Sequence, residues 1–427
     1  MSANLEVCLL LLLLFCCFRH VGRSGLLTWS RNRPRTKSNG ASGPRVRAPA
    51  DTADPDTAFK QQRLKAWQPI LTPKAVLPTL FIIGLIFAPI GALIIWGSGK
   101  VTNFTLDYTE CDAQPGDGSW AEMPKSKWDY ELKTGSPVSK SSINAPKWAF
   151  TSNPSGPVGE RSQCRIQFDV PYDLGPGVFM YYKLTNYYQN HRRYVNSFDS
   201  DQLLGKRRDV SGIDGGNCKP ITSEGGKAYY PCGLIANSFF NDTYGTNLVL
   251  LNAPNGEQNA TYSFTEKNIA WHGIAKQYVA RPYVPNDDPT QLLPPPNWAE
   301  RYPNGYQTLE DIPNLEENEH FHIWMRVAAL PTFRKLWMRN DNDIMVAGTY
   351  EIVINMNYPV KQFSGTKSVV ISTVSWIGGK QPFLGWAYVA AAILCVVLAL
   401  AGLVRHLIKP RKLGDMSLLS WNQPTQR

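Results

Sequence analysis

The chain has 427 residues, of which 43% are hydrophobic, 11% aromatic and only 18% charged, a composition too apolar for a chain that is mainly disordered. It carries 44 Lys and Arg against 34 Asp and Glu, a formal net charge of +10. Such an excess indicates a nucleic-acid-binding protein only if the charge lies on the folded domain, so its distribution along the chain decides that question.

Residues 1–57 are predicted to form a disordered extension, because the stretch 28–58 is rich in Arg, Pro, Ser, Thr and Ala and poor in large apolar side chains. It begins with a leucine-rich run, Val7–Phe18, which has the length of a signal-peptide core. The residues before this run include Glu6 and no Lys or Arg, which is wrong for a signal peptide. An interfacial segment and a start site upstream of the functional one are the alternatives, and we favour the second.

Two uncharged apolar runs predict transmembrane helices. Val76–Trp96 has 21 residues and Phe383–Val404 has 22, and neither contains a charged side chain. About 20 apolar residues, rising 1.5 Å each, cross a hydrocarbon core of roughly 30 Å. The chain is therefore expected to divide into a membrane-proximal segment (58–75), a first span (76–96), a large intervening domain (97–382), a second span (383–404) and a tail (405–427).

The basic excess lies outside the two spans. Residues 1–75 hold 12 Lys and Arg against 4 acidic residues, residues 405–427 hold 5 against 1, and the part between holds 27 against 29. Positively charged flanks face the cytosol, so both tails are predicted to be cytosolic and residues 97–382 to form a lumenal or extracellular ectodomain. A nucleic-acid partner is not expected, because the folded domain is not basic; the flanking charge suits anionic membrane lipid instead.

Cysteines and glycosylation sequons agree with this orientation. Four of the eight cysteines, Cys111, Cys164, Cys218 and Cys232, fall in the ectodomain, where an oxidising compartment would join them as two disulfides with three possible connectivities. We favour sequential pairing, because Cys218 and Cys232 bracket a Gly225-Gly226 hairpin turn. All three N-x-[ST] triplets also lie there, at Asn103, Asn241 and Asn259.

The ectodomain is predicted to be one β-rich domain, a sandwich-like antiparallel fold with short helical insertions. Gly348–Val360 alternates apolar and polar side chains, as a half-buried antiparallel strand does. Further strands are expected at 179–184, 321–327 and 367–376, and short helices at 186–196 and 332–339. In the second helix Phe333, Leu336 and Trp337 would share one face.

No pattern in the chain predicts catalysis or a cofactor. A Walker loop, a nucleophile elbow and an H-E-x-x-H motif are all absent from the sequence. His320 and His322 would share a face of the expected strand 321–327, but without a third ligand they are better explained as hydrogen-bonded or solvated histidines. The acidic residues favour solvated clusters over a calcium or glycosidase site; they are Asp287, Asp288, Glu316, Glu317 and Glu319.

Two sets of residues are candidate contacts for a partner protein. The first is a Tyr/Arg cluster in the ectodomain, which fits a packing face and a binding surface about equally; it contains Tyr181, Tyr182, Tyr187, His191, Arg192 and Arg193. The second is a set of small residues at four-residue spacing in the second span, including Ala387 and Ala391, which suits either pairing with the first span or docking on a larger membrane protein.

Five long motifs resemble the CDC50/LEM3 family, the accessory subunits of P4-type lipid flippases. They are AFKQQRLKAWQPILTP at 58–73, MYYKLTNYYQNHRRYV at 180–195, PCGLIANSFFNDT at 231–243, FHIWMRVAALPTFRKLW at 321–337 and STVSWIGGKQPFLG at 372–385. The resemblance runs from about residue 57 to residue 409. It implies an ectodomain that covers the lumenal loops of a P4-type ATPase, spans that pack beside that pump, and a role in its folding and exit from the endoplasmic reticulum.

From these features we expect a non-catalytic subunit of a lipid-translocating ATPase in a membrane of the secretory or endosomal route. Arg63 and Trp67 near the first span, and Phe333 and Trp337 in the ectodomain, complete the candidate contacts. A two-span channel subunit and a membrane-anchored glycan-binding or hydrolytic ectodomain are the alternatives; neither explains the long motifs.

Overall fold

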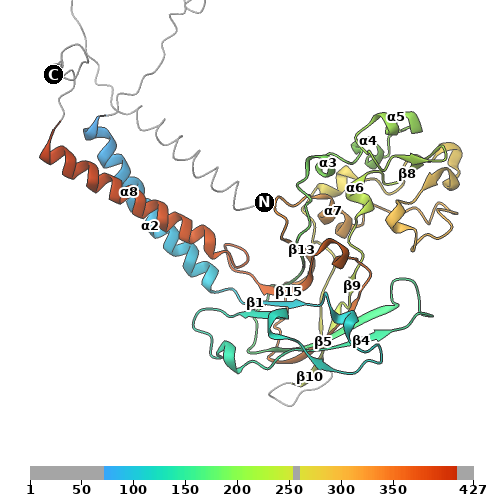
Figure 1. Ribbon diagram of the computed structural model, residues 1–427, viewed down its shortest axis with the longest axis horizontal. Helices are drawn as coiled ribbons and strands as arrows, with labels where there is room; N and C mark the ends of the chain where they lie inside the picture. Colours follow the sequence, from blue (N-terminus) through green and yellow to red (C-terminus); the bar gives the residue numbers. More distant parts are fainter. Residues whose placement is uncertain (1–71, 253–259, 411–427) are drawn as a thin grey trace, which may run out of the picture. The chain divides into compact units, whose positions relative to one another are not determined.

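Residues 72–252 and 260–410 are described in the computed structural model, where they form two compact units (Figure 1). One is the sheet-rich stretch 92–385, and the other consists of the helical residues on either side of it. The expected N-terminal extension, with its leucine-rich run, and most of the C-terminal tail lie outside the described residues.

Two 27-residue helices, α2 (Pro73–Gly99) and α8 (Pro382–Ile408), contain the expected spans. At 1.5 Å per residue each is about 40 Å long, enough to cross a bilayer core. The helices pack side by side: a Cβ added at Gly84 of α2 would lie 2.7 Å from Val396 Cγ2 of α8, so glycine is needed for the close approach. Phe87 and Tyr388 also meet, with ring centroids 5.2 Å apart.

The ectodomain is built on two antiparallel sheets. The first has the strand order β13-β6-β15-β1-β3; its strands are β1 (Asn103–Asp107), β3 (Trp128–Glu131), β6 (Val178–Leu184), β13 (Phe333–Asn340) and β15 (Lys367–Thr373). The second has the order β11-β10-β14-β5-β4-β2, with β9 also paired to β14; its strands are β2 (Ala121–Glu122), β4 (Lys147–Ser152), β5 (Ser162–Val170), β9 (Thr243–Tyr244), β10 (Asn247–Asn252), β11 (Thr261–Ser263) and β14 (Gly348–Asn355).

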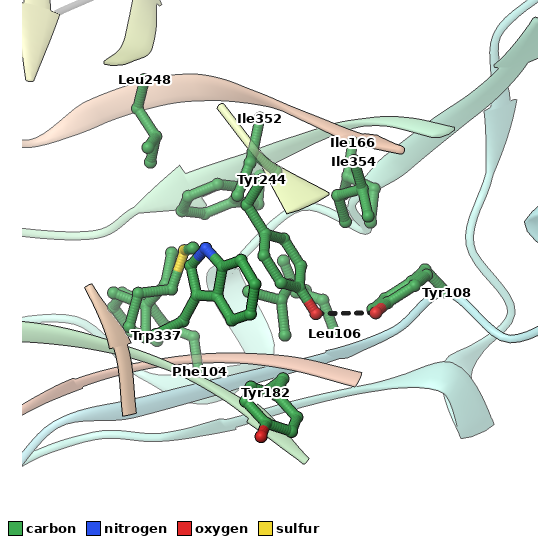
Figure 2. Close-up of a cluster of buried hydrophobic side chains, with 14 of the residues drawn as sticks. Phe104, Leu106, Tyr108, Ile166, Tyr182, Tyr244, Leu248, Trp337, Ile352 and Ile354 are labelled. Atoms are coloured by element: carbon green, nitrogen blue, oxygen red, sulfur yellow. Dashed lines mark hydrogen bonds between the residues drawn. The ribbon is translucent and has the colours of Figure 1, made fainter. Parts of the chain in front are cut away.

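The two sheets face each other across an apolar core, which confirms the sandwich expected from the sequence. Figure 2 shows Phe104 and Leu106 of the first sheet opposite Ile352 and Ile354 of the second. In β14 the side chains at 350, 352 and 354 are buried while those between them are half-buried, which is the alternation that the sequence predicts.

A smaller helical region is inserted between the strands and has its own buried cluster. It contains α3 (Arg192–Val195), α4 (Ser200–Leu203), α5 (Val210–Gly215), α6 (Leu234–Asn237) and α7 (Glu319–Met325), with a small sheet of β7 (Ser223–Glu224), β8 (Lys227–Tyr229) and β12 (Leu292–Leu293). The β7–β8 hairpin turns at Gly225 and Gly226, which both have positive φ, as expected from the sequence. Short 3-10 helices lie at Cys111–Ala113, Lys125–Lys127, Lys140–Ser142, Ile274–Gln277, Pro285–Asp287, Pro289–Gln291, Pro296–Trp298 and Lys361–Phe363.

Two disulfides link the strands and the insertion in sequential order. Cys111–Cys164 joins the turn after β1 to β5 of the second sheet. Cys218–Cys232 closes the segment that contains the β7–β8 hairpin. Cys395 lies in α8 as a free thiol.

Two secondary-structure predictions are wrong, and both fail at the same motif. Residues 321–327 are not a strand: Glu319–Met325 is the helix α7, capped by Asn318 Oδ1, which accepts the Phe321 N–H at 2.9 Å. Residues 332–339 are not a helix but the strand β13. A bulge between Leu336 and Met338 turns both Trp337 and Met338 inward, while Phe333 and Leu336, the other members of the expected helical face, stay half-buried. The expected helix 186–196 is helical only over α3, and the expected strand 348–360 ends at Asn355.

Candidate partner-binding surfaces

The strand β6 separates two neighbouring tyrosines of the candidate cluster. Tyr181 points away from the core, and the Arg334 guanidinium lies 5.1 Å from its ring centroid. Tyr182 is only 2% exposed and stacks on Phe240 with ring centroids 4.1 Å apart. Trp337, at 5% exposed, packs edge-on against Tyr182 at 5.8 Å. Tyr182 and Trp337 are therefore not surface contacts; they are core residues that support the surface from beneath.

Tyr187 is the centre of an aromatic cluster that joins two of the long motifs. Its ring lies 5.7 Å from that of Trp324 and 6.1 Å from that of Phe333. The backbones are joined as well, because Tyr187 N–H donates to the Pro331 carbonyl at 3.0 Å. Gln189 adds a side-chain acceptor for the Ala328 N–H at 2.8 Å. The motifs at 180–195 and 321–337 thus form one packed unit, and Tyr187 and Phe333 are half-buried within it.

An exposed basic edge follows directly after this aromatic cluster. His191, Arg192 and Arg193 are exposed and lie beside Lys219 around an open hollow of about 550 Å³. In the described part of the chain no carboxylate forms an ion pair with Arg192, Arg193 or Lys219. We call Arg192, Arg193 and Lys219, with His191, the basic edge. Unpaired cations of this kind suit an acidic partner surface.

A buried ion pair fixes the segment that leads into β9. The Asp242 carboxylate is fully buried and lies 2.8 Å from Nζ of Lys367, which is itself buried. It also accepts the Tyr108 hydroxyl at 2.8 Å and the N–H groups of Asn357 and Tyr358 at 2.5 and 2.6 Å. Burial and the Asp242 carboxylate raise the pKa of Tyr108 well above its ordinary value, so the hydroxyl stays protonated and donates.

A second buried lysine closes the end of α7. Lys335 Nζ donates to the carbonyls of Ile323 at 3.0 Å and of Trp324 and Arg326 at 2.7 Å. Burial lowers the pKa of Lys335, and Arg326 lowers it further. The three carbonyls, however, accept all three protons of an ammonium group at the negative end of a helix, so the geometry favours the charged form.

The two histidines and two of the five carboxylates considered as metal ligands have structural contacts instead. His320 stacks on Trp337 and His322 on Tyr278, on different sides of α7, so the shared face expected from a strand does not exist. Glu319 accepts the backbone N–H groups of Asn268, Ile269 and Ala270 at 2.7–2.8 Å. Asp288 caps the turn at Thr290. Across residues 72–252 and 260–410, three or more potential metal ligands nowhere come together.

The small residues of α8 pack mainly on α2. Ala392, Cys395 and Ala399 are buried, and a Cβ at Gly84 would meet the backbone of Ala392 and the Cβ of Cys395. Ala387 and Ala391 are half-buried beside this stripe. They therefore flank the helix pair and keep part of their surface available.

The candidate glycosylation sites differ in their surroundings. Asn241 and Thr243 are exposed on either side of the buried Asp242. Asn103 begins β1, is half-buried, and its amide lies 3.4 Å from Glu131 Oε2. Asn259 lies outside the described residues, as do Arg63 and Trp67.

Sequence reasoning misses Asp242, Lys219 and the two buried lysines. Lys335 lies within β13 and Lys367 begins β15, and the sequence pattern of neither strand indicates that the ammonium group is buried. Asp242 is the middle residue of a glycosylation triplet, which draws attention to its neighbours. Lys219 is separated from Arg192 by a long stretch of sequence, so only the fold brings them together.

The comparisons with known proteins agree on one family. Residues 94–412 match the model of the LEM3 (ligand-effect modulator 3) / CDC50 family. The chain is 40% identical to the phospholipid-transporting ATPase accessory subunit CRF1 of Saccharomyces cerevisiae, over 93% of this chain and 94% of that protein. It is 38% identical to accessory subunit CDC50 of Chaetomium thermophilum (87% and 91%) and 39% identical to cell cycle control protein 50A of Bos taurus (83% and 90%). The resemblance found in the motifs is therefore confirmed: the chain belongs to the CDC50/LEM3 family.

Proposed function

We propose that this chain is a non-catalytic accessory subunit of a P4-type ATPase, required for that pump to fold, to leave the endoplasmic reticulum and to move phospholipid to the cytosolic leaflet. The observation that carries the proposal is the 40% identity, over nearly the whole of both chains, to a protein named as an accessory subunit of a phospholipid-transporting ATPase. The fold agrees, because two apolar helices and a disulfide-bonded sandwich offer binding surfaces at two levels. A channel subunit or a hydrolytic ectodomain has no comparable support.

Reconstitution tests this function directly. Purified alone into liposomes, the chain is expected neither to hydrolyse ATP nor to move labelled phospholipid. Co-expressed with its P4-type ATPase, it should co-purify in mild detergent and raise the ATP-driven lipid transport of that pump. Lipid transport by the chain alone, or full activity of every P4-type pump in cells that lack it and its paralogues, would contradict the proposal.

The orientation with both tails in the cytosol is tested by the sequons. If the ectodomain is lumenal, Asn241 and Asn259 are expected to carry glycans, since Asn241 is exposed in the fold. Treatment with a glycosidase should increase the gel mobility of the protein, and the double substitution Asn241→Gln/Asn259→Gln should abolish most of that shift. This orientation is contradicted if the protein carries no glycan and residues 97–382 can be cut by a protease in the cytosol.

The basic edge is the surface that we propose for the lumenal contact with the ATPase. Its three cations form no ion pair with a carboxylate among the described residues, and its backbone is held by the Tyr187 cluster directly behind it. The Tyr194 hydroxyl, between the two, forms a hydrogen bond with the Ser238 hydroxyl at 2.8 Å and accepts the amide N–H of Gln189 at 3.2 Å. A rigid cationic surface loses little conformational freedom when it binds an acidic loop.

Reversing the charge of the basic edge is expected to weaken assembly. The variant Arg192→Glu/Arg193→Glu should reduce the amount of ATPase that co-purifies by about tenfold or more, with a steeper loss at low salt, because opposite charges become like charges across the contact. Lys267→Glu/Lys276→Glu is the matched control: it makes the same change in net charge at two exposed lysines elsewhere on the domain. Equal losses from both variants would show that the basic edge has no special role.

A further inference from the structure

A cavity of about 460 Å³ lies beside Asn241, between the start of α7 and the end of β14. Its volume is in the range of cavities that hold small ligands. One wall is aromatic: the His320 ring stacks on Trp337 with centroids 3.8 Å apart, and Trp298 adds a half-buried indole. Flat rings of this kind pack well against the C–H face of a sugar ring.

Three residues that line this cavity carry buried polar atoms without a hydrogen-bond partner in the described structure: both ring nitrogens of His320, Nε1 of Trp337 and Oδ1 of Asn355. Nε2 of His320 lies 3.5 Å from Glu266 Oε1, so the tautomer that places the ring proton on Nε2 directs it toward this carboxylate and leaves Nδ1 as an acceptor. Asn355 already uses its amide N–H₂ on Thr243 at 2.9 Å, so its Oδ1 is an acceptor too. A buried polar atom without a hydrogen-bond partner destabilises the fold, so a ligand that donates hydrogen bonds to these two acceptors would stabilise this site.

The charge of the residues that line the cavity indicates which hydrogen-bond-donating ligands it favours. Three carboxylates, those of Glu160, Glu266 and Glu300, face the cavity, against one guanidinium, that of Arg301. Anionic ligands such as phosphate are therefore disfavoured. A neutral ligand with hydroxyl and amide donors and an apolar ring face fits the aromatic wall, the buried acceptors and the acidic lining. N-acetylglucosamine is such a ligand.

The backbone at Asn241 points to where that sugar comes from. Asn241 is itself part of the cavity wall, and it is the acceptor residue of the triplet Asn241-Asp242-Thr243. The buried carboxylate of Asp242, held by Lys367 and two backbone N–H groups, fixes the chain on the C-terminal side of Asn241. A glycan attached there would begin on rigid backbone at the cavity, whereas a glycan on a loop would sample open solvent.

We propose that the cavity holds the first N-acetylglucosamine of an N-linked glycan on Asn241, so that this sugar is a packed part of the fold. The site is independent of the accessory function proposed above. In this arrangement the ring covers the His320–Trp337 stack, and its hydroxyl and amide groups donate to Nδ1 of His320 and Oδ1 of Asn355.

Native deglycosylation tests the proposal on the unmodified full chain, produced with high-mannose glycans and purified in detergent. Endoglycosidase H cuts between the first two sugars, so its rate at each site can be followed by mass spectrometry of glycopeptides. We expect cleavage at Asn241 to be at least about tenfold slower than at Asn259 in the native protein, and equal after denaturation. Equal rates in the native protein, or an Asn241 without glycan, would overturn the proposal.

A double-mutant cycle shows whether the sugar uses this cavity. His320→Phe keeps a ring against Trp337 but removes the Nδ1 acceptor, and Asn241→Gln removes the glycan. If the two groups interact, His320→Phe should lower the melting temperature by about 2–4 °C more in the glycosylated chain than in the Asn241→Gln chain. Additive shifts would overturn the contact.

Free N,N′-diacetylchitobiose distinguishes the two sources of sugar. If the cavity belongs to the Asn241 glycan, the free disaccharide should raise the melting temperature of the Asn241→Gln chain and leave that of the glycosylated chain unchanged. An equal rise in both would mean that the cavity takes glycans from outside the chain, which overturns the assignment. None of these measurements requires the ATPase, so their failure is distinguishable from a failure of the proposed function.

Discussion

Asp242→Asn is expected to lower the free energy of unfolding of the ectodomain by about 3–5 kcal/mol, because it leaves the ammonium of Lys367 buried without its counter-ion. The Asp242 side chain is fully buried and accepts hydrogen bonds from four donors. Lys367 Nζ has one further acceptor, the Tyr358 carbonyl at 2.9 Å. The substitution preserves the triplet as Asn-Asn-Thr, so glycosylation of Asn241 is not removed with the charge. Tryptophan fluorescence during thermal unfolding of the full chain measures the effect.

The companion variants identify the cause of that loss. Lys367→Met alone should also destabilise strongly, because it leaves the Asp242 carboxylate buried, whereas Asp242→Asn/Lys367→Met should recover a large part of the stability by removing both charges. Asp201→Asn is the control, since it breaks the exposed Lys206–Asp201 pair and should have little effect. A double variant as unstable as the sum of the two single variants would show that the pair itself is not the cause.

Opening either disulfide is the second large effect that we expect. In the chain-entropy account a bridge across 14 residues, as in Cys218–Cys232, contributes about 3 kcal/mol, and one across 53 residues, as in Cys111–Cys164, about 4 kcal/mol. Cys218→Ser and Cys111→Ser should therefore both be retained in the endoplasmic reticulum, with the second the less stable. Their glycans should stay sensitive to endoglycosidase H, and the ATPase should be retained with them.

Cys395→Ser provides the control for the disulfide variants, because Cys395 is a free thiol in α8. It should leave the non-reducing peptide map and the export of the complex unchanged. A map in which the four ectodomain cysteines are free or paired in another order would contradict the connectivity, and normal export of Cys218→Ser would contradict the stability argument.

The sequence predicts the parts of this fold whose signals are local. Uninterrupted apolar runs predict α2 and α8, and the alternation around Ile352 predicts β14. The failures come from features that depend on distant contacts. The bulge at Trp337 exists because β13 must pair with β6 while both Trp337 and Met338 fill the core. The helix α7 is stabilised because it buries Phe321 and Trp324 against residues that are distant in the sequence. A period of side chains cannot by itself distinguish these cases.

The candidate surfaces divide in the same way. The basic residues 191–193 are adjacent in the sequence and can be named from it, but their isolation from carboxylates and the presence of Lys219 beside them follow only from the fold. Tyr181 and Tyr182 look alike in the sequence, and the strand period places one outside and one inside. The cavity beside Asn241 could not be predicted, because its walls come from residues that lie between 158 and 357.

The order of strands in the first sheet determines when the sheet can be completed during synthesis of the chain. β15, the last strand of the ectodomain to be made, lies between β6 and β1, and pairs Asn103 with Ser372 and Met180 with Ile371. Until it arrives, the ribosome has delivered β1 and β6 with open hydrogen-bonding edges, which are prone to wrong pairing. The first sheet can be completed only after β15 has been synthesised, shortly before the chain reaches α8. A nascent chain truncated before β15 should therefore depend on chaperones to keep these two edges from wrong pairing.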